Sequence, residues 1–210
     1  LSTLHQSSLG SLFLITPGRL HPLWYSPFLP VFFFVSAVAA GLAMVIVEGA
    51  LSHVFFHDRI APALRESFDS LTLGLGKAAA VVLFAYFGIK VVGVASDHHW
   101  HLLTTPYGLL FLVEVLGFVL LPCVVFAWGY RNQKVRAVRV AAVLTVVGIV
   151  FNRLNVGVIA LGWRADPVYT PSFAEVATSV VIVIAGIVVF RWIVRRMPIL
   201  DEHVEYKWQH

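Results

Sequence analysis

Charged residues are scarce in this chain, and their scarcity sets its class. Only 12% of the 210 residues are charged, while 59% are hydrophobic and the mean hydropathy is +0.86. Soluble domains have about a quarter of their residues charged. Several apolar runs reach the roughly 20 residues that a helix needs to cross a bilayer. The composition therefore argues against a soluble domain and predicts a polytopic membrane protein.

Cysteine and histidine are missing where a bound redox centre needs them. The single cysteine, Cys123, excludes an intrachain disulfide and a cysteine-ligated iron–sulfur or zinc site, so we expect it to pack in the core. Haem b in a membrane bundle needs histidines that face one another within the spans, and the spans predicted below have none at depth. The DHHWH loop carries His98, His99 and His101. It lacks the second ligand cluster of a zinc site, so we predict a solvated loop and no metal.

Five apolar runs predict an all-α bundle of transmembrane helices. We interpret residues 1–210 as a single integral membrane domain without a soluble part. The opening residues, LSTLHQSSLGSLFLI, form either the end of an earlier span or an interfacial helix. The chain starts without methionine, which suggests that further helices precede it. The predicted spans cover residues 28–50, 72–95, 107–128, 138–162 and 174–194.

Basic residues gather in alternate loops, and this predicts the orientation. By the positive-inside rule, such loops face the cytoplasm, which places the C-terminus there. The HQSSLG segment, the DHHWH loop and the WRADPVYTPS loop then lie on the outer side, with Trp24 and Tyr25 at headgroup depth. The net charge of +4 thus reflects membrane topology and not nucleic-acid binding. The basic residues that carry this prediction are Arg59, Arg65, Arg131, Lys134, Arg136, Arg139, Arg191, Arg195, Arg196 and Lys207.

The stretch FNRLN places Arg153 between Asn152 and Asn155 inside an apolar run. An ionisable group near the centre of a span costs about 2.5–3.5 kcal/mol, so it needs a partner. Arg153 lies about 13 Å and Glu114 about 10 Å from the outer ends of their predicted helices. We therefore predict a buried Arg153–Glu114 ion pair. It either locks two helices together or organises a polar pocket for a redox or protonated ligand.

The remaining charges near the spans have simpler interpretations. Glu48 lies toward the cytoplasmic end of the first span, where a carboxylate can reach water. Lys77 and Lys90 can extend their ammonium groups to the interface, so we assign them no chemistry. Glu175 begins the last span on the outer side.

His5 is the histidine best suited to ligand contact. It precedes Gln6, Ser7 and Ser8 in a polar stretch on the predicted outer side. A histidine titrates near neutrality, so it can donate a hydrogen bond to a quinone carbonyl and pass on a proton. The alternative is a polar helix end without a ligand.

Four ordered segments resemble one family: LHQSSLGSLFLI, HPLWYSPFLPVFFFVSAVAAGLAMVIVE, FNRLNVGVIALGWR and YTPSFAEV. Together they are similar to the NrfD/PsrC family, the membrane subunits of polysulfide reductases, and most similar to its HybB-type branch. The resemblance runs from about residue 4 to residue 176. Members usually have eight to ten spans, so this chain resembles the C-terminal half, and a separate chain is one source for the other helices.

The resemblance implies a helical subunit that binds menaquinone or ubiquinone but no haem or iron–sulfur cluster of its own. It would sit in the cytoplasmic membrane of a bacterium or archaeon, beside a ferredoxin-like iron–sulfur subunit and an exported catalytic subunit, and would not be catalytic alone. Glu48 would lie on a proton path, and Glu175 would be a structural or gating group. Gly10 would shape the quinone wall. The quinone contacts that the resemblance implies are His5, Ser8, Asn152, Arg153 and Asn155.

Two other functions remain open at this stage. The charges that we expect in the outer half, including Glu114, also fit a proton or ion pathway without a quinone site. A purely structural membrane anchor explains the spans but not this concentration of charge.

Overall fold

The computed structural model describes residues 2–15, 17–55, 62–164 and 171–196. All regular structure in these ranges is helical, which confirms the all-α prediction. The elements are α1 (Ser2–Leu12), η1 (Phe13–Ile15), α2 (Leu29–Phe55), α3 (Pro62–Ser96), η3 (His99–Thr104), α4 (Pro106–Leu112), η4 (Val113–Leu120), α5 (Leu121–Arg131), α6 (Val135–Leu154), η5 (Asn155–Ala160) and α7 (Phe173–Arg196).

The five predicted spans are all present. Two of them are composite: α4, η4 and α5 run on as one rod, and α6 continues into η5. The opening residues fold as α1, which covers 11 residues. The segments long and apolar enough to cross a membrane are Leu29–Ser52, Ser67–Ser96, Pro106–Arg131, Val135–Ala160 and Phe173–Ile193.

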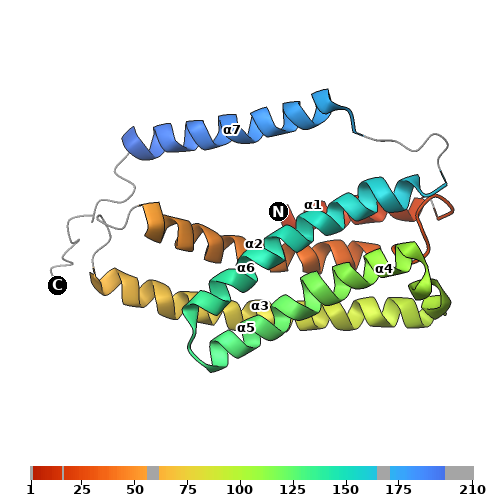
Figure 1. Cartoon of the computed structure of the whole chain (residues 1–210), viewed down its shortest axis with the longest axis horizontal. Helices are drawn as coiled ribbons and strands as arrows, with labels where there is room; N and C mark the ends of the chain where they lie inside the picture. The colour runs from red at the N-terminus through yellow and green to blue at the C-terminus, as the bar shows by residue number, and fades with distance from the viewer. Residues whose placement is uncertain (1, 16, 56–61, 165–170, 197–210) are drawn as a thin grey trace, which may run out of the picture.

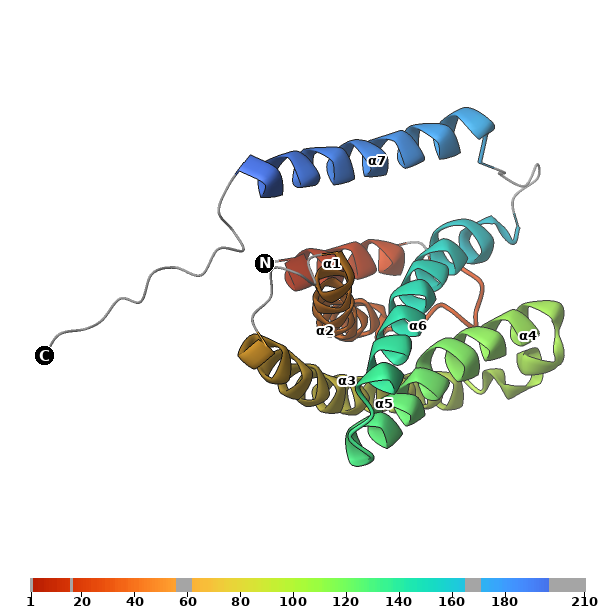
Figure 2. The ribbon, with the colours of Figure 1, turned by 60° about the vertical axis from the view of Figure 1, so that its left-hand side comes forward.

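Four of these rods form the bundle. The helix α2 packs against α1, α3 and α6, while α5 packs against α3 and α6 (Figure 1). The chain thus folds up and down, and the short α1 lies along α2 on the outside of the bundle (Figure 2).

Small residues set how closely three helices approach. Val138 of α6 faces Gly76 of α3 and Gly129 of α5, and a Cβ added to either glycine would lie only 2.7 or 2.9 Å from a methyl carbon of Val138. Lipid tails are as apolar as the side chains, so helix association in a bilayer depends on such close packing. Cys123 lies in the same core and donates to the Ala80 carbonyl (Sγ–O 3.3 Å), which agrees with the packing role expected of it.

The last helix, α7, stands apart from the bundle. None of its Phe173–Ile193 span is buried, and its ribbon is separate from those of the other helices in both views (Figure 1 and Figure 2). Apolar side chains cover its surface on every side. Its composition fits a lipid or protein environment, because a helix that is apolar all round belongs in either.

Candidate functional site

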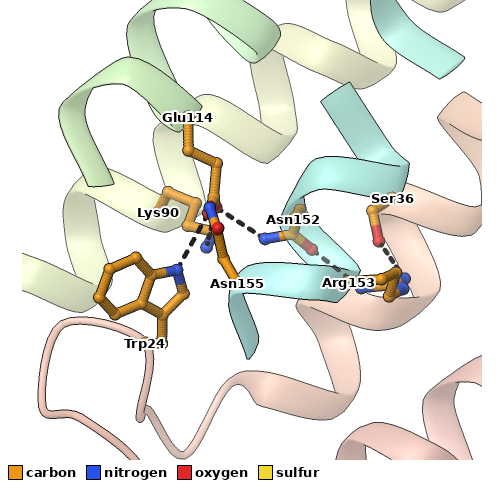
Figure 3. A network of polar contacts seen from close by, with 7 residues as sticks. All are labelled: Trp24, Ser36, Lys90, Glu114, Asn152, Arg153 and Asn155. Carbon is orange, nitrogen blue, oxygen red and sulfur yellow. Dashed lines mark hydrogen bonds and ion pairs between the residues drawn. The ribbon is translucent and has the colours of Figure 1, made fainter. Parts of the chain in front are cut away.

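The centre of the candidate site is the carboxylate of Glu114, which is 1% exposed. Four hydrogen-bond donors surround it (Figure 3). Oε1 accepts from Lys90 Nζ (3.3 Å) and Asn152 Nδ2 (2.6 Å). Oε2 accepts from Trp24 Nε1 (3.0 Å) and Asn155 Nδ2 (2.8 Å). Both oxygens are therefore saturated, as a buried carboxylate requires.

Lys90 supplies the opposite charge, which corrects two predictions. Its side chain is 5% exposed, so it does not extend to the interface. Its ammonium group lies 5.2–5.7 Å from the ring centroids of Phe32, Tyr86 and Phe111. Aromatic faces attract a cation, and they replace some of the water that Lys90 has lost. Glu114 thus forms its ion pair with Lys90. The predicted direct pair between Glu114 and Arg153 is wrong.

Arg153 is connected to Glu114 through an amide. Its Nη1 donates to Asn152 Oδ1 (3.0 Å), while Asn152 Nδ2 donates to Glu114. Its Nη2 donates to Ser36 Oγ (2.8 Å), and the guanidinium carbon lies 3.8 Å from the centroid of the Phe33 ring. Arg153 is only partly buried, whereas Glu114, Asn152 and Asn155 are buried. Arg153 is therefore the member of the network that a ligand can reach from outside the bundle.

Local helix geometry brings the two asparagines to the carboxylate. Asn152 and Asn155 are three residues apart and so share a helix face. The backbone changes to a π-helix at Asn155, and Glu114 is the second residue of the other π-helical segment, η4. Such wide turns shift the side-chain register and occur often at functional sites.

A small cavity adjoins this network. Ser36, Tyr86, Glu114 and Asn152 provide its polar lining, and its volume is about 10 Å³. That is room for about one water molecule. A quinone ring does not fit there, so the network around Glu114 is a packed interior and not a ring-binding pocket.

Trp24 belongs to this interior, although its sequence position predicted headgroup depth. Its indole is 2% exposed and makes an edge-on contact with Phe111 (centroids 5.5 Å apart). The loop before α2 folds inward because the His21 backbone N–H donates to the Ala160 carbonyl (2.9 Å). This contact joins the loop to the end of η5.

His21 is a buried histidine that the sequence did not single out. Its ring lies among Trp24, Tyr107 and Trp163, with centroid distances of 4.8–5.5 Å. Its Nδ1 accepts from the Leu23 backbone N–H (3.2 Å), which requires that this nitrogen carry no proton. Burial lowers the pKa of His21, and the neighbouring charge of His99 lowers it further. Its place between three aromatic rings depends on tertiary contacts that no local pattern encodes.

The other predicted site residues lie outside the Glu114 network. His5 and Ser8 are exposed on α1, and Ser8 Oγ donates to the Leu4 carbonyl of its own helix (3.2 Å). Gly10 is buried where α1 crosses the start of α2, and an added Cβ would lie 2.9 Å from Leu29 O. Glu48 is exposed toward the far end of α2.

Glu175 caps the start of α7. The Ser172 backbone N–H donates to Glu175 Oε2 (3.2 Å), and the Glu175 backbone N–H donates to Ser172 Oγ (3.3 Å). This reciprocal pair is a capping box, and the SFAE spacing in the sequence already indicates it. Glu175 therefore has a structural role, which is to cap the first turn of α7.

The histidine-rich loop forms the short helix η3. The His99 and His101 rings lie 6.5 Å apart (centroid to centroid), and His98 has a positive φ of 53° just before them. Within the described ranges, no three histidine, cysteine or acidic side chains come together as metal ligands would.

Comparison with known proteins identifies relatives that are longer than this chain. Residues 8–161 match the family described as "Polysulphide reductase, NrfD". A protein of Nitratidesulfovibrio vulgaris is 52% identical over 212 residues, which cover 100% of this chain and 55% of that protein. The probable Ni/Fe-hydrogenase 2 b-type cytochrome subunit of Escherichia coli K12 is 28% identical over 207 residues, which cover 95% of this chain and 50% of that protein. The chain thus spans about half the length of the curated relatives that it matches. No solved structure matches it.

Proposed function

Because the chain belongs to the polysulphide reductase NrfD family, we propose that it is the quinone-reactive part of a membrane subunit in a respiratory oxidoreductase complex. The observation that carries this proposal is the polar network of Glu114, Asn152 and Arg153, which begins at a buried carboxylate and ends at a partly exposed guanidinium. A packed structural ion pair has no need for such an open end.

The head group would contact the network from the Arg153 side. The cavity beside Glu114 is too small for a ring, whereas Arg153 lies in a membrane span and is partly exposed. A bound quinone takes up two electrons and two protons. Arg153 would donate a hydrogen bond to one carbonyl oxygen and stabilise the negative charge that develops there. Asn152 and Ser36 would fix the direction of the guanidinium, and Asn155 would hold the Glu114 carboxylate in place.

Helix α1 would form the neighbouring wall of the site. The Phe33 ring stacks under Arg153 and also lies 5.8 Å from the Phe13 ring (centroid to centroid), directly after α1. His5 and Ser8 are on the exposed surface of this helix. In this arrangement His5 donates to the second carbonyl of the quinone and exchanges a proton with it.

Electrons would come from or go to a partner. We propose a ferredoxin-like iron–sulfur subunit and an exported catalytic subunit, in a cytoplasmic membrane with the C-terminus of this chain inside. The Escherichia coli relative is named a b-type cytochrome subunit. We nevertheless propose that this chain ligates no haem itself, since the five membrane spans found within the described ranges contain no histidine. Helices corresponding to the other half of the relatives would complete the subunit.

Substitution of Arg153 tests the quinone assignment. We expect Arg153→Gln to lower quinone turnover by the assembled complex about 100-fold, the usual loss when one donor to a developing oxyanion is removed. The matched control is Arg164→Gln, because Arg164 is an exposed arginine that stacks on Trp163 outside the network (4.3 Å). Co-purification of the partner subunits monitors assembly. An assembled Arg153→Gln complex with normal quinone turnover would refute the role of this residue.

A proton or ion pathway without a quinone site is the second candidate. The water-sized cavity between Glu114, Tyr86 and Ser36 favours it, because one water there would extend the polar network toward α2 and α3. Glu48 would then belong to the far end of the path. Proton uptake by liposomes that contain the complex, measured with and without a quinone-analogue inhibitor, separates the two functions. Uptake that survives complete inhibition favours the pathway.

A further inference from the structure

The turn between α5 and α6 lies at the end of the bundle away from α4 (Figure 1). Polar and charged side chains form a second polar region there. A cavity of about 540 Å³ opens there. Its charged and polar lining comes from Asp69 of α3, Gln133 and Lys134 of the turn, and Arg136 and Arg139 of α6. The volume is within the usual range for a site that holds a small molecule.

The charge of this lining is mostly positive. Three cations face one carboxylate, and Asp69 already accepts from Arg139 Nη2 (2.8 Å). Lys134 and Arg136 are exposed. The cavity thus has a surplus of positive charge that suits an anion.

One buried donor in this lining lacks an acceptor. Within the described part of the chain, Arg139 Nε is buried and has no hydrogen-bond partner. Buried donors are nearly always satisfied in native proteins. An oxygen atom from outside the chain would complete the hydrogen bonding of Arg139, and a phosphate oxygen matches the geometry of a guanidinium well.

An apolar surface continues from the cavity along α6. Val140 and Val143 are each at least half exposed, and they lie four residues after Arg136 and Arg139. Positions four apart share a helix face, so the cations and the valines form one continuous strip. The strip lies in the Val135–Ala160 span, where acyl chains are the surrounding medium.

We propose that this cavity binds the phosphate headgroup of an anionic phospholipid, whose acyl chains lie on the Val140–Val143 surface. Lys134, Arg136 and Arg139 contact the phosphate, and the Arg139 Nε donor gains its acceptor. Basic pockets at the membrane surface select acidic lipids in this way. A free phosphate ion shares the headgroup chemistry but makes no use of the apolar strip.

Native mass spectrometry of the purified full chain in detergent tests the proposal. The probes are phosphatidylglycerol, phosphatidylcholine and inorganic phosphate. We expect phosphatidylglycerol to bind at least ten times more tightly than the other two. The double variant Lys134→Gln/Arg136→Gln should weaken its binding by about 30-fold, the factor expected for two cations removed next to an anionic lipid. Both residues are exposed, so the variant should fold.

Arg131→Gln is the matched control, because Arg131 is an exposed cation at the same end of the bundle that does not line the cavity. Its binding of phosphatidylglycerol should stay within about twofold of the unaltered chain. Equal losses in the control and the double variant would mean diffuse surface attraction, and would overturn the site. Equal affinity for inorganic phosphate would overturn the lipid as ligand. Thermal unfolding without lipid checks that both variants are folded.

Discussion

Two ion pairs in this bundle differ in their exposure to solvent and in the contacts around them. Lys90 and Glu114 are 5% and 1% exposed and 3.3 Å apart, whereas Arg139 and Asp69 are 29% and 48% exposed and 2.8 Å apart. The short distance does not make the exposed pair a large contributor to stability, because both of its members are partly solvated. The buried pair needs three further donors and three aromatic rings around it. The burial of a charged side chain therefore decides how much stability is lost when its partner is removed.

Removal of Lys90 should have the largest effect on stability. Lys90→Met leaves Glu114 charged and without its cationic partner in a buried site, which should lower the free energy of unfolding by about 3–5 kcal/mol. Unfolding by sodium dodecyl sulfate in mixed micelles measures the loss. Lys90→Met/Glu114→Gln removes the stranded charge and keeps an acceptor, so the double variant should be more stable than the single one. If Lys90→Met were as stable as Asp69→Asn, the expected difference between the buried and the exposed ion pair would be wrong.

Loss of the indole donor should have the next largest effect. Trp24→Phe keeps the aromatic packing against Phe111 but removes the hydrogen bond to Glu114 Oε2. A hydrogen bond to a charged group contributes about 1.5–3 kcal/mol. The control Trp163→Phe removes a donor to the neutral Arg19 carbonyl (3.1 Å) and should cost about 0.5–1.5 kcal/mol in the same assay. If Trp163→Phe lost more unfolding free energy than Trp24→Phe, the charge of the acceptor would not explain the difference between the two hydrogen bonds.

Acidification should weaken the loop that delivers Trp24. The pKa of His21 is lower in the folded chain than its ordinary value of 6.5. The unfolded chain therefore binds more protons, so the stability contributed by neutral His21 is complete above pH 6.5 and is lost as the pH falls through the folded pKa. His21→Asn keeps an acceptor for the Leu23 N–H without a titrating ring. Its melting temperature should fall less than that of the unaltered chain between pH 7.5 and pH 5.5, and an equal fall would exclude His21 as the cause.

The exposed pair should contribute least. Asp69→Asn removes a carboxylate that is half exposed, so the free energy of unfolding should change by about 1 kcal/mol or less. The small remaining contribution should vanish in 1 M salt, because ions screen exposed charges. A loss as large as that of Lys90→Met, or one unchanged by salt, would remove the contrast between the two regions.

The prediction of Arg153 as the partner of Glu114 was wrong for a physical reason. The depth of each residue follows from its distance along a helix, and Arg153, Glu114 and Lys90 all have plausible depths. The sequence does not show which face of each helix turns toward its neighbours. Lipid and neighbouring helices are equally apolar, so the hydrophobic pattern does not distinguish them. The π-helical turns at Glu114 and Asn155 shift the side-chain directions further.

The number, order and approximate limits of the membrane spans can all be read from the amino-acid sequence. Hydrocarbon demands about 20 apolar residues per helix and internal hydrogen bonding of the backbone, and both requirements are local. The sequence also indicated that Glu114 and Arg153 needed partners in the interior. The identity of these partners depends on how the chain packs, because Trp24 comes from a folded loop and Lys90 from another helix. Desolvation of a charge depends on everything around it, and that exists only once the helices have packed.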